Sequence, residues 1–266
     1  MTSEPSPPAG LPIGHQHARL DSGELALDMN ELARAMGYRQ LATDADGADQ
    51  RRVIPEHMTT LAAEMLSRGR ELLEPQWLWV PVPVTIDSSR EVLTCRPPLN
   101  ATLAIGKTVR VQLRGCLAIA AFVVTIGDRL ETEARRLMQA GQPLEGYVLD
   151  AVGSLAAEAT ADVLEKRVAA AVTVMDWKIT NRFSPGYCSW ETADQRALFK
   201  LFPERPVGVT LSKSALMTPI KSISGLIGLG ADVEYRPYPC EFCTLTTCHQ
   251  RLTEARLGTD TLSSRG

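Results

Sequence analysis

The chain has 266 residues, which suits one large domain or two small ones and allows a core without disulfide or metal staples. Its formal net charge is −3 and its basic residues are scattered, which argues against binding to nucleic acid or an anionic membrane. Its most apolar run, residues 116–126, is too short for a membrane span, which needs roughly 20 residues. No secretory signal is visible, so we expect a cytoplasmic protein with reduced cysteines.

The N-terminal part of the chain predicts an arm and two helices. Residues 1–22 are rich in proline, serine and glycine, and we expect a flexible arm there. Residues 29–36 are predicted to form a short helix, with Asp28 or Asn30 as its cap. Apolar side chains recur at helical spacing over residues 55–73, which predicts a second helix.

A section rich in β-strands follows. Residues 77–84 combine alternating valines with prolines, which predicts a strand at the edge of a sheet. Residues 103–105 and 109–113 are shorter strand candidates. Residues 116–126 are continuously apolar and rich in valine and isoleucine, which predicts a strand buried on both faces.

The second half of the chain is mainly helical. Helices are expected at residues 130–140, 144–174 and 192–202, and strands at 207–211 and 222–233, with Gly153 as a candidate break. This order lacks a regular strand–helix–strand repeat, so we predict the α+β class, with a mostly antiparallel sheet flanked by helices. The predicted organisation is an arm over residues 1–22, a single domain over 23–236 and a cysteine-containing tail over 237–266.

Residues 181–187, with the sequence NRFSPGY, combine groups that could bind a ligand. Arg182 is a permanent cation on an expected loop, and Pro185 with Gly186 forces a turn. Tyr187 adds a flat ring with a polar tip. A guanidinium can bind a carboxylate through two parallel hydrogen bonds. The alternative is an ordinary surface turn whose arginine closes a helix C-terminus.

This segment resembles the Arg-x-x-x-Gly-Tyr motif of the activation domain of cobalamin-dependent methionine synthase. Residues 214–225, SALMTPIKSISG, are similar to the second signature of that domain, which has a Met-x-Pro-x-x-Ser-x-Ser-Gly core. The two motifs occur in the order and at the separation of the family, and the resemblance covers about residues 144–235. It implies the α+β fold of that activation domain.

The resemblance also implies a site for S-adenosylmethionine in a shallow groove. Arg182 would hold the methionine carboxylate, and Glu158 would accept hydrogen bonds from the amino or hydroxyl groups of the ligand. The backbone would shape the groove around Phe183, Gly186 and Tyr187, and the carbonyl of Ile227 would meet the adenine. The serines of the second motif, Ser222 and Ser224, are expected to hold the turn rather than contact the ligand.

The implied function is reductive methylation, or reactivation, of cobalamin in a methyltransferase, most simply methionine synthase. The cobalamin would lie on a partner protein, because the chain has no evident module for cobalamin, folate or homocysteine. An electron donor is a further expected partner, and no residue of this chain is expected to be catalytic. Alternatives are a reductive activator of another corrinoid methyltransferase and a non-catalytic metal-binding interaction protein.

Three cysteines near the C-terminus, Cys240, Cys243 and Cys248, form the second informative pattern. A Cys-x-x-Cys turn presents two thiolates to one metal, and a third thiolate nearby supplies most of a site. The spacing leaves zinc, an iron–sulfur cluster and a metal-free tail open. A fourth ligand could come from Cys188, Cys95, Cys116 or His249.

Overall fold

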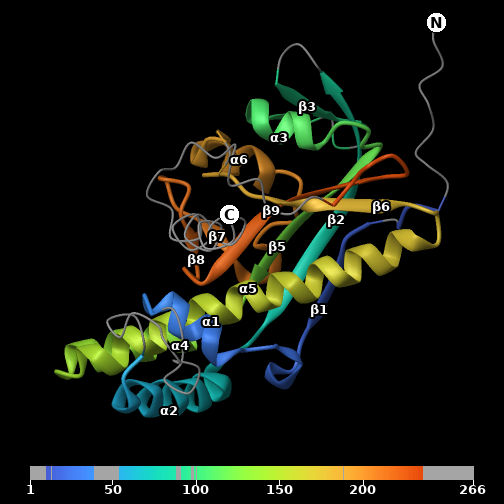
Figure 1. The fold of residues 1–266 in the computed structure, drawn as a ribbon. Coiled ribbons are helices and arrows are strands. Elements are labelled where there is room, and N and C mark those ends of the chain that lie inside the picture. Colours follow the sequence, from blue (N-terminus) through green and yellow to red (C-terminus); the bar gives the residue numbers. More distant parts are fainter. Residues whose placement is uncertain are drawn as a thin grey trace, which may run out of the picture.

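The structure is a computed structural model, and it describes residues 10–12, 14–38, 54–87, 91–96, 99, 101–187 and 189–235. Its main helices are α1 (Met29–Ala35), α2 (Glu56–Leu72), α3 (Gly106–Gln112), α4 (Arg129–Gln139), α5 (Pro143–Thr173) and α6 (Gln195–Phe199). The strands are β1 (Gln16–Arg19), β2 (Gln76–Asp87), β3 (Val92–Cys95), β4 (Thr102–Ala104), β5 (Ala118–Thr125), β6 (Lys178–Phe183), β7 (Thr210–Leu211), β8 (Met217–Thr218) and β9 (Ser222–Gly230). Helices and strands are mixed along the chain, which confirms the α+β class (Figure 1).

The main sheet has the order β4-β3-β2-β5-β9-β6, with β1 also paired to β2. Every strand pair within the described residues is antiparallel, as predicted. All residues of β5 are buried, which confirms the expectation of a strand covered on both faces. Its neighbour β9 lies between β5 and β6, so the second motif of the sequence enters the centre of the sheet.

The prediction that β2 is an edge strand is wrong for the order of the sheet, in which β2 lies between β3 and β5. One side of β2 pairs with β5, and the other side pairs with β1 at residues 76–79 and with β3 at 84–87. The two prolines, Pro81 and Pro83, fall in the gap between these two partners. A missing N–H disrupts no ladder there, which is why an internal strand tolerates them.

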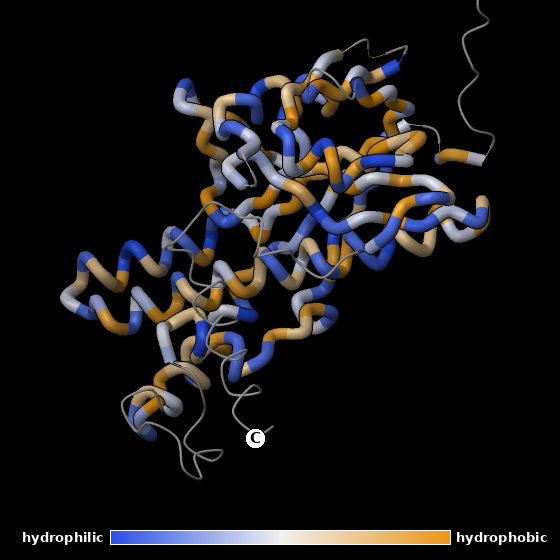
Figure 2. The backbone as a smooth tube through the Cα atoms, turned by 45° about the horizontal axis from the view of Figure 1, so that its top comes forward, coloured by the Kyte–Doolittle hydropathy of each residue, from blue (hydrophilic) through white to orange (hydrophobic). Residues whose placement is uncertain are grey.

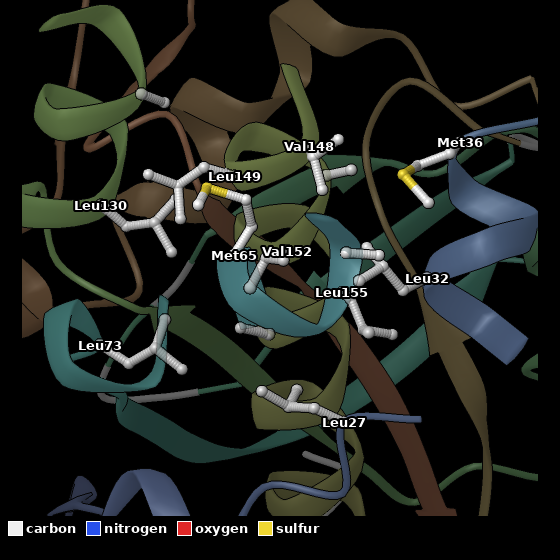
Figure 3. Close-up of a cluster of buried hydrophobic side chains, with 14 of the residues drawn as sticks. Leu27, Leu32, Met36, Met65, Leu73, Leu130, Val148, Leu149, Val152 and Leu155 are labelled. Atoms are coloured by element: carbon white, nitrogen blue, oxygen red, sulfur yellow. The ribbon is translucent and has the colours of Figure 1, made fainter. Parts of the chain in front are cut away.

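Helix α5 crosses the whole molecule and contributes to two of its three apolar clusters. Its N-terminal half packs against α1, α2 and α4 in one cluster, part of which Figure 3 shows. Its C-terminal half packs on one face of the sheet, and α3 and α6 cover the other face (Figure 1). The helix continues through Gly153 without a break. Hydrophobic and hydrophilic positions alternate along the helices (Figure 2).

Two further expectations differ from the structure. Residues 109–113 lie at the end of helix α3 rather than in a strand. Val109 and Leu113, four residues apart, lie on one face of the helix and are fully buried, whereas Val111 between them is 48% exposed. The alternating apolar residues therefore do not share one buried face, as they would in a strand. Residues 16–19, inside the expected flexible arm, form strand β1 on β2. Their backbone groups are satisfied by that pairing although their side chains are polar.

The predicted N-cap of the first helix, Asp28, is confirmed. The carboxylate of Asp28 accepts hydrogen bonds from the backbone N–H groups of Asn30 and Glu31, at 2.8 and 3.0 Å, at the start of α1. Within the described residues, no helix is both long and apolar enough to cross a membrane.

Candidate functional site

Arg182 lies in strand β6 and not on the loop that was expected. The strand pairs irregularly with β9 between Ile179 and Arg182, and the arginine side chain turns toward α5. Its Nη2 atom lies 2.7 Å from Asp162 Oδ1, and its Nε atom lies 3.3 Å from Glu165 Oε2. A third carboxylate, Glu158, lies 3.5 Å from Nη2. The spacing of 158, 162 and 165 places these carboxylates on one face of the helix.

This cluster holds three carboxylates around one guanidinium. Burial raises the pKa of Glu158 and of Glu165, the nearby Asp162 charge raises both further, and the Arg182 charge lowers both. Tyr235 forms a hydrogen bond with Glu165, and burial raises the pKa of this tyrosine. With all groups ionised, the cluster carries more negative than positive charge, and it suits a ligand with cationic groups.

A pocket of about 230 Å³ opens beside this cluster, at the end of β6 and the start of β9. Three of the six predicted cofactor-binding residues line it, namely Glu158, Arg182 and Tyr187. The other lining residues are Ser184, Pro185, Gln195, Met217, Ser222, Ile223 and Ser224. The pocket therefore combines a charged wall from α5 and β6 with residues from both sequence motifs.

The turn after β6 shapes one side of the pocket. The Tyr187 N–H donates to the Ser184 carbonyl at 3.2 Å, and the Gly186 N–H donates to the Trp190 carbonyl at 2.7 Å. Gly186 has a φ of +97°, which a residue with a side chain rarely adopts. Tyr187 is 56% exposed at the rim. Gly186 thus acts on the pocket through the turn, since its own atoms are not among those that line it.

Phe183 and Ile227 occupy positions deeper in the sheet. The Phe183 side chain is buried in the cluster under α3 and α6, and the Ile227 side chain is buried in the cluster under α5. In register, Ile227 lies between Arg182 of β6 and Ala120 of β5. Neither residue lines the pocket, whereas Ser224, three positions before Ile227, does.

The two serines of the second motif, Ser222 and Ser224, differ in the hydrogen bonds of their hydroxyl groups. Ser222 Oγ lies 2.8 Å from the Pro219 carbonyl oxygen and 2.9 Å from Thr125 Oγ1, so this serine holds the turn as expected. Ser224 has no such bond and lines the pocket with Gln195. Gln195 was not singled out from the sequence, because nothing in the helix around it marks this position as lining the pocket.

The predicted metal ligands Cys240, Cys243 and Cys248 lie outside the described residues. Within the described residues, no group of three His, Cys, Asp or Glu side chains is arranged to hold a metal. Two candidate fourth ligands, Cys95 and Cys116, are covered by the core. Burial raises the pKa of the Cys95 thiol to about 11 and that of Cys116 to about 12, so both stay protonated at neutral pH.

Comparisons with known proteins agree with the two motifs. Residues 110–238 match a family described as the activation domain of vitamin B12 dependent methionine synthase. The fold is similar to a crystal structure of the MetH reactivation domain bound to AdoHcy, with a TM-score of 0.56 and 16% sequence identity. That similarity covers 84% of this chain and 81% of the other. A comparison with curated protein sequences finds no match.

Proposed function

We propose that this chain, whose residues 110–238 match the activation-domain family of vitamin B12 dependent methionine synthase, binds S-adenosylmethionine and supports reductive methylation of cobalamin on a partner protein. The observation that carries the proposal is the pocket in which Glu158, Arg182 and Tyr187 meet residues of the second motif. Glu158 comes from a different element than Arg182 and Tyr187, and the family resemblance predicted all three of these residues at the ligand.

The charges of the pocket fit this ligand. S-adenosylmethionine carries a sulfonium and an ammonium group, and the α5 carboxylates offer negative charge to both. Arg182 lines the same wall and can share its guanidinium donors with the methionine carboxylate. Backbone of Phe183, Gly186 and Tyr187 supports the turn at the rim, and the Ile227 carbonyl remains our proposed adenine contact.

The chemistry would need no nucleophile from this chain. Cobalamin on the partner, once reduced by an electron donor, would supply the nucleophile for the methyl group of S-adenosylmethionine, and S-adenosylhomocysteine would leave. Bound S-adenosylmethionine supplies an electrophilic methyl group. The protein contributes by holding that group in position, which lowers the entropic part of the barrier. The most direct partner is the cobalamin-binding part of methionine synthase, and another corrinoid methyltransferase is the second candidate.

Titration calorimetry with S-adenosylmethionine tests the proposal. Arg182→Met should weaken binding by about 1.5–3 kcal/mol, the scale of a charge-assisted hydrogen bond. The matched control is Arg136→Met, which removes an exposed arginine paired with Glu133 on α4, away from the pocket. Its affinity should equal that of the wild type. Absence of binding by the wild-type chain, both alone and with a cobalamin-binding partner, would contradict the proposal.

We also propose that Cys240, Cys243 and Cys248 bind a soft or borderline metal, as zinc or an iron–sulfur cluster. The spacing of the three thiols supports this, and a redox centre would suit the reduction of cobalamin. In the cytoplasm, where we place the protein, such thiols stay reduced.

Metal analysis of anaerobically purified protein tests the cysteine proposal. About one zinc per chain is expected for a zinc site, or iron with broad visible absorption for a cluster. Cys243→Ser should lose the metal, because one missing thiolate opens the site. Neither iron nor zinc in the wild-type protein would show that the tail binds no such metal.

A further inference from the structure

Two buried polar atoms of uncharged side chains on the pocket wall lack a hydrogen-bond partner among the described residues. They are Ser224 Oγ, on strand β9, and Gln195 Nε2, at the start of α6. Ser224 is 2% exposed and Gln195 is 4% exposed. Native proteins pair nearly all buried polar groups, because an unpaired one loses its bonds to water without replacement. The pocket therefore holds two groups whose hydrogen bonds the fold itself does not supply.

The neighbouring serine shows that this is a property of position. Ser222, two residues earlier on the same strand and lining the same pocket, has its hydroxyl bonded to Thr125 and to the Pro219 carbonyl. Ser224 and Gln195 come from separate elements and share only the pocket. Both an amide nitrogen and a hydroxyl can donate, so the missing partner is a hydrogen-bond acceptor of a ligand.

We propose that Ser224 and Gln195 are binding residues that donate hydrogen bonds to the nucleoside part of the ligand, to ring nitrogens or ribose oxygens. This inference rests on the proposed function. The charged end of the ligand matches Arg182 and Glu158, whose side chains are 18% and 65% exposed. Ser224 and Gln195 are far more buried, and a charged group placed beside them would lose its water.

The side chains nearby also suit a flat, neutral group. Met217, Pro185 and Ile223 line the pocket with apolar surface, and a few placed polar groups among apolar ones are typical of sites that orient a heterocycle. Neutral donors suit neutral acceptors here, because neither side then carries the desolvation cost of a charge.

Thermal unfolding of the ligand-free chain is the first test. Ser224→Ala and Gln195→Leu remove an unpaired buried group, so each should raise Tm by about 2–4 °C. Ser222→Ala is the matched control, because it removes a hydroxyl that has partners, and it should lower Tm. A lower Tm for both Ser224→Ala and Gln195→Leu would overturn the inference, since these groups would then be satisfied within the fold.

Ligand binding by the full chain is the second test, with S-adenosylhomocysteine and 5′-deoxy-5′-methylthioadenosine as probes. The second probe keeps the nucleoside and lacks the amino-acid carboxylate. Ser224→Ala and Gln195→Leu should each weaken both probes by about tenfold. Arg182→Met should weaken only S-adenosylhomocysteine.

The outcomes separate the two proposals. If the wild-type chain binds both probes and the Ser224 and Gln195 variants bind them equally well, the inference is overturned and the proposed function stands. If these variants weaken S-adenosylhomocysteine alone, the two residues contact the amino-acid end, and the inference is again overturned. If the wild-type chain binds neither S-adenosylmethionine nor the probes, the proposed function itself fails.

Discussion

Arg182 shows how one side chain can hold a site and the fold together. From the sequence we placed it on a loop. In the structure it lies on β6, is 18% exposed and contacts Asp162, Glu165 and Glu158 of α5. Removing one partner from a half-buried ion cluster leaves like charges facing each other, which is costly. Arg182 therefore joins the edge of the sheet to the long helix.

We accordingly expect Arg182→Met to lower the free energy of unfolding by about 1–3 kcal/mol at pH 7.5. Urea denaturation followed across pH should show that this loss shrinks as the pH falls. The pKa of Glu165, whose side chain is 18% exposed, is already raised by burial, and it rises further without the cation. An acid with a raised pKa in the folded state destabilises the fold once ionised, so the penalty disappears on protonation.

The control for this measurement is Arg136→Met, which loses an exposed pair with Glu133. Its effect should be below about 1 kcal/mol at neutral pH. A loss of stability for Arg182→Met that stays constant from pH 7.5 to pH 5 would show that packing of the arginine stem, and not charge, stabilises this contact.

Individual site residues were predictable only where a motif marked them. Arg182, Tyr187 and Glu158 follow from the resemblance, and all three line the pocket. Gln195 was not singled out, and Ser224 was assigned to the turn, because the hydrogen bonds of both side chains depend on how separate elements meet at the pocket. No property of a single sequence reports an unsatisfied buried group.

At the scale of elements, long and strongly patterned segments were predicted well. The continuous apolar run of β5 and the long α5 appear within one or two residues of their expected bounds. Four of the six residues in the sequence KITNRF of β6 are polar, so no pattern marked it as a strand. It is a strand because β9 offers an open ladder beside it, which only the tertiary structure supplies.

The contact between β6 and β9 depends on a glycine. A Cβ atom at Gly225 would overlap the Phe183 carbonyl oxygen and would lie 3.0 Å from Ser184 Oγ. Gly225→Ala should therefore push β6 away from β9, lower stability by about 1–3 kcal/mol and weaken S-adenosylmethionine binding. Chemical denaturation and calorimetry on the same variant measure both effects.

Gly153→Ala is the matched control within a helix. Its added Cβ meets mainly the tip of the Leu130 side chain, which can rotate away, and alanine favours the helix by about 1 kcal/mol. We expect a small change in stability and unchanged binding. Equal effects of the two substitutions would contradict the idea that close backbone approach at Gly225 shapes the pocket.

At the scale of the whole molecule, the family match begins inside α3, at residue 110, yet the fold extends well before it. Strand β2 pairs with β5 at eight positions, from Gln76 to Pro83. All three apolar clusters include residues that precede the match, such as Met65, Leu78 and Trp79. The sequence motifs therefore locate the pocket but do not mark the limits of the domain.

We expect a fragment of residues 110–238 to remain unfolded, because β5 would expose its ladder to water and each apolar cluster would lose part of its core. A fragment of residues 10–235 keeps every described contact and should unfold cooperatively, with a Tm within a few degrees of the full chain. Amide dispersion in NMR spectra and calorimetric melting distinguish the two fragments. Cooperative melting of the shorter fragment would mean that the first half of the chain is a separate unit, and that α5 and β9 suffice to hold the pocket.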